Sequence, residues 1–548
     1  MARIALAFAA AGLLALPGAA LAKGVPTVIR TGGPSAPADA KVAIVASDRN
    51  LGGERFEVEG PGEAVGGKLR PAKGFSGPWK HAYTADISAI GEPGSYRVAA
   101  AGARSKPWLV LTEGARPALQ TMLDYFATNR DGTEPALLHG PAHLNDAVLP
   151  DGRRIALQGG WMDAGDMIHF TQTTAFAATA LQLAALLDPA DAAALNSEAD
   201  VGIRWLVAAH PEPGLFIAQL GDARDHDEGF RDPASDDAAS KPGIGQRVAY
   251  PGTGGDVAGK AAAALALAAM RAPAGAGRTA LTQQAREWYA AGEAAAAPLR
   301  GLPEVAGDFY FTDSFEDDLA AGAAMLFRLT GEEVFLADAV DYLRGSPSRI
   351  GFGVYDLGSL AAADLCGGLG SPPVADSAAR DFGCATLGEA ASDARTIARQ
   401  TAFANPGPFS WGTTAETGSY GTAAALAGRT GVAADGLAVA AGGRDYLLGR
   451  NPWGASFVTG FGPKAPREPH HWASVFGDGL PNGAVVGGPA PLDQLTEQGF
   501  GKGRSAFAKF STSKSSYEDR RANYVNSEPA IDYTAASILL IAAVNGQP

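Results

Sequence analysis

The stretch Lys260-Ala-Ala-Ala-Ala-Leu-Ala-Leu-Ala-Ala-Met270 indicates the fold class of most of the chain. Alanine has the highest helix propensity, and its small side chain lets helices pack closely. A helix that is apolar on nearly every side belongs in a core. The tail Ala535 to Val544 is likewise apolar and rich in alanine. Both stretches are shorter than the ~20 apolar residues that span a bilayer, so we expect buried helices.

Apolar residues at helical spacing continue through the chain after residue 112. They predict about twelve helical segments, which begin near Arg116, Gln172, Ala194, Asp256, Arg278, Phe315, Glu333, Tyr355, Thr386, Thr414, Ala433 and Pro529. The sequence shows no repeat of fixed length, which argues against a solenoid. An even number of paired helices fits an α/α barrel, although periodicity does not show whether such a ring closes. Long glycine- and proline-rich loops at 221–254 and 459–516 are the type of segment that carries function.

The region before residue 112 has a different pattern. Short alternating runs at 41–45, 55–58, 95–98 and 108–111 are separated by glycine and proline. Several short strands at this spacing predict a β-sandwich. We therefore expect a small β domain at residues 23–112 and a helical domain at residues 113–548.

Composition excludes several classes of protein. Hydrophobic residues make up 46% of the 548 residues, which rules out global disorder. The chain carries 44 Lys and Arg against 58 Asp and Glu, a net charge of −14. An acidic chain without a long basic run is not expected to bind nucleic acid or an anionic membrane as its main partner. The composition does not indicate an oligomeric state.

Residues 1–22 are typical of a secretory signal peptide. Arg3 supplies a positive start, an apolar run follows, and Ala20-Leu21-Ala22 is a small-x-small cleavage site. The alternative is a membrane anchor, for which the apolar run is short. We expect a periplasmic or secreted product without a membrane span after cleavage. In that compartment Cys366 and Cys384 could form one disulfide, or remain two buried thiols.

Three segments combine residue types that carry chemistry. The first is Gly159-Gly160-Trp161-Met162-Asp163-Ala164-Gly165-Asp166, in which two carboxylates lie three residues apart on a glycine-bracketed turn. Paired acids can hold and deprotonate a water molecule. The alternative is an acidic turn that caps the following helix.

The second segment places Pro469-His470-His471-Trp472 on the long loop after Asp445. Adjacent histidines on an extended loop point in different directions, so one of them suits a hydrogen bond to a ligand better than both suit a metal. The alternative is a structural loop histidine.

The third segment runs from Tyr517 to Tyr533 and contains Glu528 just before an apolar helix. Aromatic surroundings would desolvate this carboxyl group and raise its pKa, as a general acid requires. The alternative is a glutamate that favours a helix N-terminus.

Together, these three segments resemble glycoside hydrolase family 9, the inverting cellulases, and they occur in the family's order. Residues 143–166, 314–319 and 409–412 also resemble family segments, and the N-terminal region resembles the immunoglobulin-like module that often precedes these enzymes. The resemblance implies an (α/α)6-barrel glycoside hydrolase domain at 113–548 behind an immunoglobulin-like β-sandwich at 23–112. It covers nearly all of the mature chain.

The resemblance also implies roles for individual residues. Asp166 matches the base that activates water, Asp163 matches the residue that helps to position that water, and Glu528 matches the acid. The expected sugar-binding residues are His470, Trp161, Trp411, Trp472, Tyr517, Asp519 and Tyr524, with Trp453 as a further stacking candidate. For each of the four tryptophans the alternative is packing in the core. Inverting hydrolysis requires no cofactor. Some family members bind structural calcium, and Ser314, Asp317, Asp318 and Asp356 match those positions; the alternative is an acidic helix start. The acidic loop residues Asp222, Asp225, Asp227 and Glu228 are predicted to form a solvated surface.

The sequence departs from the family pattern at four positions. Trp472 replaces an arginine after the histidines, Thr534 an asparagine after the acid, His169 a lysine and Ala142 a cysteine. An indole donates one hydrogen bond, whereas an arginine donates several. We therefore expect the contacts to the sugar to differ from those in family members with arginine.

The expected function is therefore hydrolysis of β-1,4-glucan, with a polysaccharide or oligosaccharide as the partner. The alternatives are an exo-acting hydrolase of short β-linked oligosaccharides or amino sugars, and a carbohydrate-binding protein without activity.

Overall fold

The computed structural model describes residues 25–302, 309–310, 312–347, 351–369, 374–477, 479–503 and 505–546. The predicted signal peptide at residues 1–22 lies outside these residues. Among the residues described, no helix has both the length and the apolar character needed to cross a membrane.

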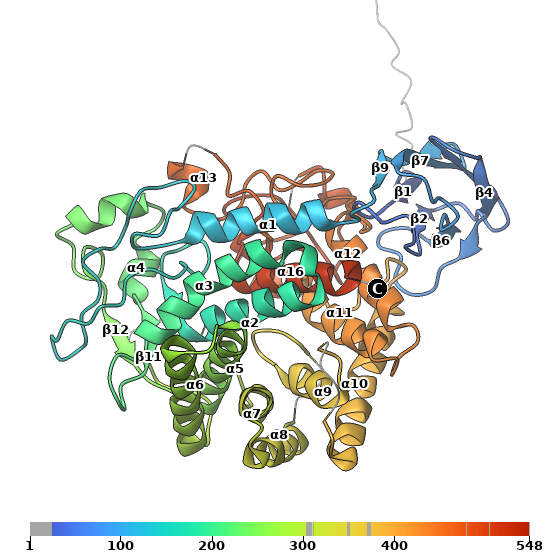
Figure 1. Cartoon of the computed structure of the whole chain (residues 1–548). Coiled ribbons are helices and arrows are strands. Elements are labelled where there is room, and N and C mark those ends of the chain that lie inside the picture. The colour runs from blue at the N-terminus through green and yellow to red at the C-terminus, as the bar shows by residue number, and fades with distance from the viewer. Residues whose placement is uncertain are drawn as a thin grey trace, which may run out of the picture.

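Residues 28–110 form two antiparallel sheets, seen in blue at one end of the molecule in Figure 1. The first sheet has the order β1-β2-β6-β5 and comprises Val28–Arg30, Val42–Ser47, His81–Asp86 and Arg70–Pro71. The second contains β4-β3-β7-β8, with β9 also paired to β7, and comprises Val65–Lys68, Arg55–Glu59, Gly94–Ala100, Ala103–Arg104 and Trp108–Val110. Their inner faces share an apolar core that includes Val45, Phe56, Tyr83 and Val98. The prediction of a small β domain before residue 112 is confirmed.

In the part of the chain that the structure describes, six helices form a closed inner ring. Each packs against the next in the order α2, α5, α7, α9, α11 and α16, and α16 packs against α2 to close the ring. Their bounds are Thr171–Leu187, Gly255–Arg271, Glu316–Thr330, Gly358–Cys366, Thr413–Arg429 and Ile531–Asn545. Glycines permit the closest contacts: a Cβ on Gly259 of α5 would collide with the backbone of Asp318 in α7. A Cβ on Gly418 of α11 would come within 2.8 Å of the Ala536 carbonyl carbon in α16.

Six outer helices cover this ring, which gives the (α/α)6 architecture that the sequence suggested. They are α1, α3, α6, α8, α10 and α12, at Arg116–Asn129, Ala192–Ala208, Ala276–Ala295, Glu333–Gly345, Ser377–Ala398 and Gly436–Leu447. Shorter elements lie in the connecting loops: α4, α13, α14 and α15 at Ala223–Asp227, Ala473–Phe476, Leu492–Glu497 and Tyr524–Ser527; 3₁₀ turns at Pro189–Asp191, Pro233–Ala238 and Ala508–Phe510; and strands β10, β11 and β12 at His169–Phe170, Ile217–Leu220 and Ala249–Pro251.

The twelve long helices begin within three residues of their predicted starts, with one exception. Helix α10 begins at Ser377, whereas the apolar pattern predicted a start near Thr386. The Asp376 side chain accepts a hydrogen bond from the Ala379 amide and thereby caps the helix. In residues 377–385 only Ala379 and Gly383 are buried, so these turns carry no apolar stripe that a pattern could detect.

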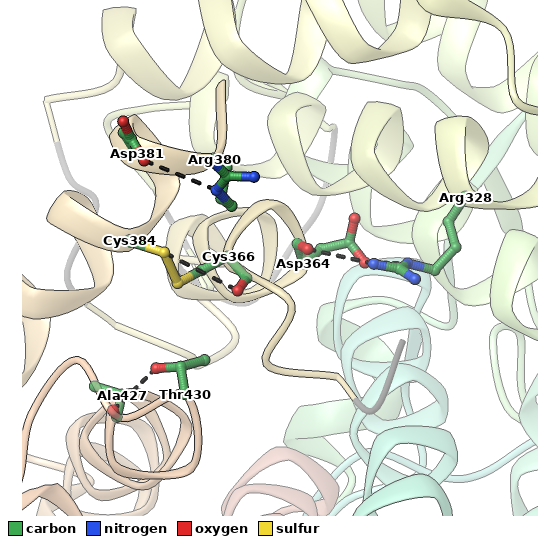
Figure 2. The surroundings of a disulfide bond; sticks show 8 residues. All are labelled: Arg328, Asp364, Cys366, Arg380, Asp381, Cys384, Ala427 and Thr430. Atoms are coloured by element: carbon green, nitrogen blue, oxygen red, sulfur yellow. Dashed lines mark hydrogen bonds and ion pairs between the residues drawn. A yellow bond between two sulfur atoms is a disulfide. The ribbon is translucent and has the colours of Figure 1, made fainter. Parts of the chain in front are cut away.

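Cys366 at the end of α9 and Cys384 in α10 form a disulfide (Figure 2), which resolves the alternatives left open by the sequence. It joins two residues 18 apart and closes a short loop at the barrel edge. In the chain-entropy model, a bond of this span stabilises a fold by ~3 kcal/mol. Beside it, Arg328 of α7 pairs with Asp364 of α9, so that a buried carboxylate also links two inner helices.

The β domain packs directly on the barrel. The Trp79 ring stacks on Phe510 with ring centroids 5.6 Å apart. The Arg30 guanidinium donates two hydrogen bonds to the Pro452 carbonyl, at 3.1 and 2.8 Å. Trp79 and Ile44 belong to the same apolar cluster as the barrel helices, so the two domains share part of one core.

We expect Trp79→Ala to lower the free energy of unfolding of the whole chain by ~3–5 kcal/mol, because the substitution opens a cavity in this shared core. Thermal unfolding followed by the helical circular-dichroism signal measures the effect. The exposed Leu109→Ala is the control in the same domain, with an expected change within ~0.5 kcal/mol. An unchanged helical transition in Trp79→Ala would show that the barrel does not depend on the β domain.

Candidate active site

The two paired aspartates lie on a tight turn between α1 and α2. The Asp163 amide donates to the Ile168 carbonyl at 2.9 Å, which closes the turn. Gly160 has φ +77°, and a Cβ at this position would lie 2.7 Å from the Trp205 ring. Only glycine fits this backbone conformation and this space. The local sequence therefore fixes the direction in which Asp163 and Asp166 project.

Asp163 is buried at the bottom of the turn. Its carboxylate accepts hydrogen bonds from the Thr173 hydroxyl at 2.5 Å and the Tyr310 hydroxyl at 2.6 Å. Burial raises the pKa of Asp163 to about 7, against the effect of these two donors. The two hydroxyl groups, one from α2 and one from a turn, hold the carboxylate in a fixed orientation.

Asp166 is the more accessible of the pair and forms an ion pair with a histidine. Nδ1 of His226 in α4 lies 2.7 Å from an Asp166 carboxylate oxygen. This hydrogen bond raises the pKa of His226 to about 9, so the imidazole is positively charged at neutral pH. The Asp166 carboxylate is therefore in direct contact with a cation.

Glu528 lies beside the same turn, between α15 and α16. Its carboxyl oxygen accepts a hydrogen bond from the Gly165 amide at 3.3 Å. Burial, and then the negative charge of Asp166, raise the pKa of Glu528 to about 8. A carboxyl group that keeps its proton at neutral pH therefore lies beside the turn that carries Asp166 and its cationic partner His226.

Backbone hydrogen bonds join the three predicted segments to one another. The Ile531 amide donates to the Asp163 carbonyl at 2.9 Å, and the Trp472 amide donates to the Gly165 carbonyl at 3.3 Å. The His470 amide donates to the Ser527 carbonyl at 2.9 Å. A Cβ on Gly165 would collide with the His470 carbonyl and lie 2.9 Å from Glu528 Oε1. The segments can approach this closely only because residue 165 is glycine.

A buried ionic network supports the turn from behind. The Arg247 guanidinium donates to Asp131 and Asp146, each at 2.7 Å, and to the Met167 carbonyl. Asp131 also contacts His143 at 2.8 Å and His169 at 2.9 Å. A paired and hydrogen-bonded cation of this kind fixes the loops that it joins. His169, which replaces a family lysine, thus belongs to the support of the turn.

Predicted sugar-binding residues His470, Tyr524 and Trp411 lie together. The His470 and Tyr524 rings are 5.8 Å apart, and the Tyr524 and Trp411 rings are 5.7 Å apart. His470 Nδ1 donates to the Arg521 carbonyl at 2.7 Å, which leaves Nε2 as the acceptor of the neutral ring. Trp411 is 41% exposed and can offer a ring face to a sugar.

Other aromatic side chains predicted to stack on sugars are buried, so those predictions are corrected. Trp161, Trp453 and Tyr517 lie in the core, where the Trp161 indole donates to Glu198 and the Trp453 indole donates to Ser511. Trp472 is 1% exposed and packs among Met162, Met167 and Ala473. In this position it fills an apolar space below the turn instead of replacing the hydrogen bonds of an arginine.

Asp519 positions the histidine loop. Its carboxylate accepts hydrogen bonds from the amides of Arg467 at 2.9 Å and Glu468 at 3.0 Å, just before His470. Asp519 thus connects the segment that contains Glu528 to the loop that carries His470, through backbone amides of that loop.

The solvated surface predicted for the acidic loop is wrong for two of its four residues. Asp222 caps α4 and accepts a hydrogen bond from the Tyr250 hydroxyl at 2.6 Å. Asp225 is buried and pairs with Arg231. Both carboxylates fold the loop that carries His226, whereas Asp227 and Glu228 are exposed.

The four predicted calcium ligands already have protein partners. Ser314 donates to Asp317 at 2.6 Å, Asp318 pairs with the Lys260 ammonium, and Asp356 accepts hydrogen bonds from the amides of Gly351 and Gly358. Among the residues described, no group of three or more candidate ligands could hold a metal ion. This arrangement does not fit calcium, because the ion would have to displace Lys260 from Asp318.

A cavity of about 220 Å³ lies between α9 and α11, where its Tyr355 ring is 6.3 Å from the ring of Tyr310, the partner of Asp163. Its walls include four aromatic side chains and two acidic ones, namely Tyr355, Trp411, Tyr420, Tyr533, Asp356 and Glu416. Burial and the neighbouring Asp356 raise the pKa of Glu416 to about 7.

Sequence patterns missed three residues of the site: His226, Tyr310 and Thr173. His226 and Asp166 are 60 residues apart, and only the folded chain brings them together. The long loop at 221–254 was a general indication of function, but it did not identify its histidine. Tyr310 and Thr173 have no local motif that distinguishes them from core residues.

Comparisons with known proteins agree with this geometry. A family model described as "Glycosyl hydrolase family 9" matches residues 116–541. Endoglucanase 5 of Arabidopsis thaliana is 27% identical over 497 residues, which cover 78% of this chain and 74% of that protein. Endoglucanase B of Cellulomonas fimi is also 27% identical, over 82% of this chain and 44% of that protein.

Solved structures show the same fold over the β domain and the barrel together. A single-mutant thermostable endoglucanase from Alicyclobacillus acidocaldarius superposes with a TM-score of 0.80 at 24% identity. The match covers 95% of this chain and all of that one.

We expect Lys260→Met to destabilise the protein by ~3–5 kcal/mol, because it leaves the buried Asp318 carboxylate without its cation. Urea unfolding measures the loss. Lys73→Met, at an exposed lysine, is the matched control, with an expected change within ~0.5 kcal/mol. A Lys260→Met protein as stable as the control would show that the ammonium does not stabilise this cluster.

Proposed function

Because the chain belongs to glycosyl hydrolase family 9, we propose that it hydrolyses β-1,4-glucan with inversion at the anomeric carbon. The observation that carries this proposal is the contrast between two neighbouring carboxyl groups. The pKa of Glu528 is raised to about 8, whereas Asp166 is paired with a positively charged His226. Two carboxyl groups in different protonation states are what an inverting hydrolase requires.

In the proposed reaction, Asp166 takes a proton from a water molecule while the water oxygen bonds to the anomeric carbon. The bond from that carbon to the leaving oxygen breaks, and Glu528 gives its proton to the leaving oxygen. Asp163 helps to orient the water, since Thr173 and Tyr310 fix its carboxylate. Afterwards Asp166 is protonated and Glu528 is ionised, and exchange with solvent restores both groups. No cofactor takes part in these steps.

We propose that His470 accepts a hydrogen bond from a sugar hydroxyl through Nε2, and that Trp411 stacks on a sugar face. The apolar start of the chain supports export, so we place the enzyme in the periplasm or outside the cell. Its substrate is a polysaccharide or oligosaccharide.

Hydrolysis of carboxymethylcellulose, mixed-linkage β-glucan and cellohexaose, with products resolved by size, tests the proposal. A spread of mid-length products would establish endo cleavage. Release of single sugars from short oligomers alone would favour the exo-acting alternative, and binding without hydrolysis would favour a carbohydrate-binding protein. Proton NMR of the first product formed should show the α-anomer; a first product in the β form would contradict inversion.

The acid role of Glu528 predicts a substrate-dependent defect. Glu528→Gln should reduce kcat/KM on cellohexaose by ~10²–10⁴-fold, because no proton reaches the leaving oxygen. On a dinitrophenyl cellobioside, whose leaving group needs no proton, most activity should remain. Asp166→Asn is the contrast, since loss of the base should impair both substrates. Equal losses on both substrates in Glu528→Gln would contradict the acid role.

The pKa of Glu528 also predicts the pH profile. The wild-type kcat/KM on cellohexaose should fall as the pH rises through about 8, because the acid is then deprotonated. The same enzyme on the dinitrophenyl substrate should show no such fall. If kcat/KM fell above pH 8 on both substrates, a group other than Glu528 would be responsible for the pH dependence.

Gly165→Ala should reduce kcat/KM by ~10²-fold or more. The added Cβ would push the turn that carries Asp163 and Asp166 away from Glu528 and His470. Gly140→Ala is the control, as a Cβ there meets no atom within 4 Å. Full activity of Gly165→Ala would contradict the close approach of these segments.

A further inference from the structure

Four positively charged side chains meet where the β domain packs on the barrel. Arg30 at the end of β1 and Lys106 just before β9 belong to the β domain. Lys464 in the loop after α12 and Lys509 in the 3₁₀ turn at Ala508–Phe510 belong to the barrel. Figure 1 shows β1 and β9 on the side of the β domain that faces the barrel. These four residues, the junction cluster, come from four separate segments, so only the folded chain brings them together.

The ring of Phe510 lies in the middle of the junction cluster. Its centroid is 5.1 Å from the guanidinium carbon of Arg30, 5.7 Å from Lys464 Nζ and 5.0 Å from Lys509 Nζ. Trp79 of the β domain stacks on the same ring. Three positive charges around one ring are close enough to repel one another. The attraction of cations to the ring offsets only part of this repulsion.

No carboxylate balances the charge of the junction cluster. None of its four residues forms an ion pair with an acidic side chain in the part of the chain that the structure describes. Arg30 donates instead to the Pro452 carbonyl, and Lys464 donates to the Trp453 carbonyl at 2.7 Å. The chain has 58 Asp and Glu against 44 Lys and Arg, so acidic partners are abundant elsewhere. A group of four unpaired cations is therefore a specific feature of this junction.

Two of the cations are partly removed from water. Burial lowers the pKa of Arg30 to about 10. Burial, and then the positive charges of the other three cluster residues, lower the pKa of Lys464 to about 8. Both shifts mean that the surroundings disfavour positive charge, and a bound anion would reverse this effect. Lys106 and Lys509 are exposed, so an anion can reach the cluster from solvent.

The donor groups indicate which kind of anion fits. Guanidinium and ammonium groups together supply charge and several N–H donors, which is how proteins bind phosphate. Nη1 of Arg30 makes no hydrogen bond with the described residues, and neither do the ammonium groups of Lys106 and Lys509. A carboxylate carries one negative charge, whereas a phosphate group carries up to about two at neutral pH. A phosphate group therefore balances more of the charge of the junction cluster.

We propose that the junction cluster binds a phosphate group, and that this anion ties the β domain to the barrel. The group belongs either to free inorganic phosphate or to a phosphate ester such as an anionic lipid headgroup. The site shares no residue with the catalytic turn or the acid segment, so the inference does not depend on the proposed function.

Isothermal titration calorimetry with inorganic phosphate, at low ionic strength and neutral pH, tests the site. The wild-type protein should bind phosphate, and the binding should weaken as sodium chloride is added, because salt screens the charges. The double variant Lys106→Met/Lys509→Met should raise the Kd by ~10-fold or more, since each exposed charge partner contributes a few-fold. Phosphate should also raise the Tm of the wild type more than that of this variant, because a bound ligand stabilises the folded state.

Lys68→Met/Arg70→Met is the matched control, since it removes two positive charges from exposed positions elsewhere in the β domain. This variant should bind phosphate as the wild type does. An equal loss of affinity in the control and the cluster variant would overturn the inference, because net charge alone would then explain the binding. An unchanged Kd in the cluster variant would overturn it as well.

Sedimentation with phosphatidylglycerol vesicles identifies the source of the phosphate group. If the wild type binds the vesicles, the cluster variant does not, and inorganic phosphate gives no titration, the group is a lipid headgroup. A titration with inorganic phosphate without vesicle binding would assign the site to the free anion. Binding of neither probe would overturn the inference and leave the proposed function intact.

Discussion

The hydrogen bond from the Ile531 amide to the Asp163 carbonyl connects the first and last parts of the barrel domain. It sets the start of α16 against the turn that carries both aspartates. Because Glu528 lies three residues before Ile531, the same contact sets the distance between acid and base. The amides of Trp472 and Gly165 add two further links at this point. Main-chain hydrogen bonds therefore hold the three segments together, whereas the side chains of Thr173, Tyr310 and His226 orient the aspartate carboxylates.

Ring closure in turn depends on small residues. The inner helices approach one another where alanine and glycine replace larger side chains, as at Gly259 and Gly418. Helix α16 is apolar almost all round because it contacts neighbours on every side. The chemistry sits at one end of this tightly packed ring, on loops that it holds in place. The helices thus provide most of the stability, and the loops at their ends carry the reactive groups.

The parts of this architecture that local physics determines could be predicted from the sequence. Alanine-rich periodic segments specify their own helices, and the glycines around Asp163 and Asp166 specify their own turn. Strand β4 could not be predicted, since Gly66 and Gly67 at its centre have low β propensity. The pairing of His226 with Asp166 and the burial of Trp472 among methionines arise only from tertiary contacts. Residue type suggested that Trp472 would touch sugar, but its surroundings make it a packing residue.

The contact between Trp79 and Phe510 has a consequence for synthesis of the chain. The β domain is made first, yet part of its surface is covered by residues made several hundred positions later. Trp79 packs on Phe510, and the Arg30 guanidinium binds the Pro452 carbonyl, 422 residues away. The inner ring likewise cannot close until α16, its last helix, has been made. A growing chain must therefore carry exposed apolar surface until its end emerges, and such surfaces aggregate unless a chaperone covers them. The architecture favours a chain that folds as a unit only after its synthesis is complete.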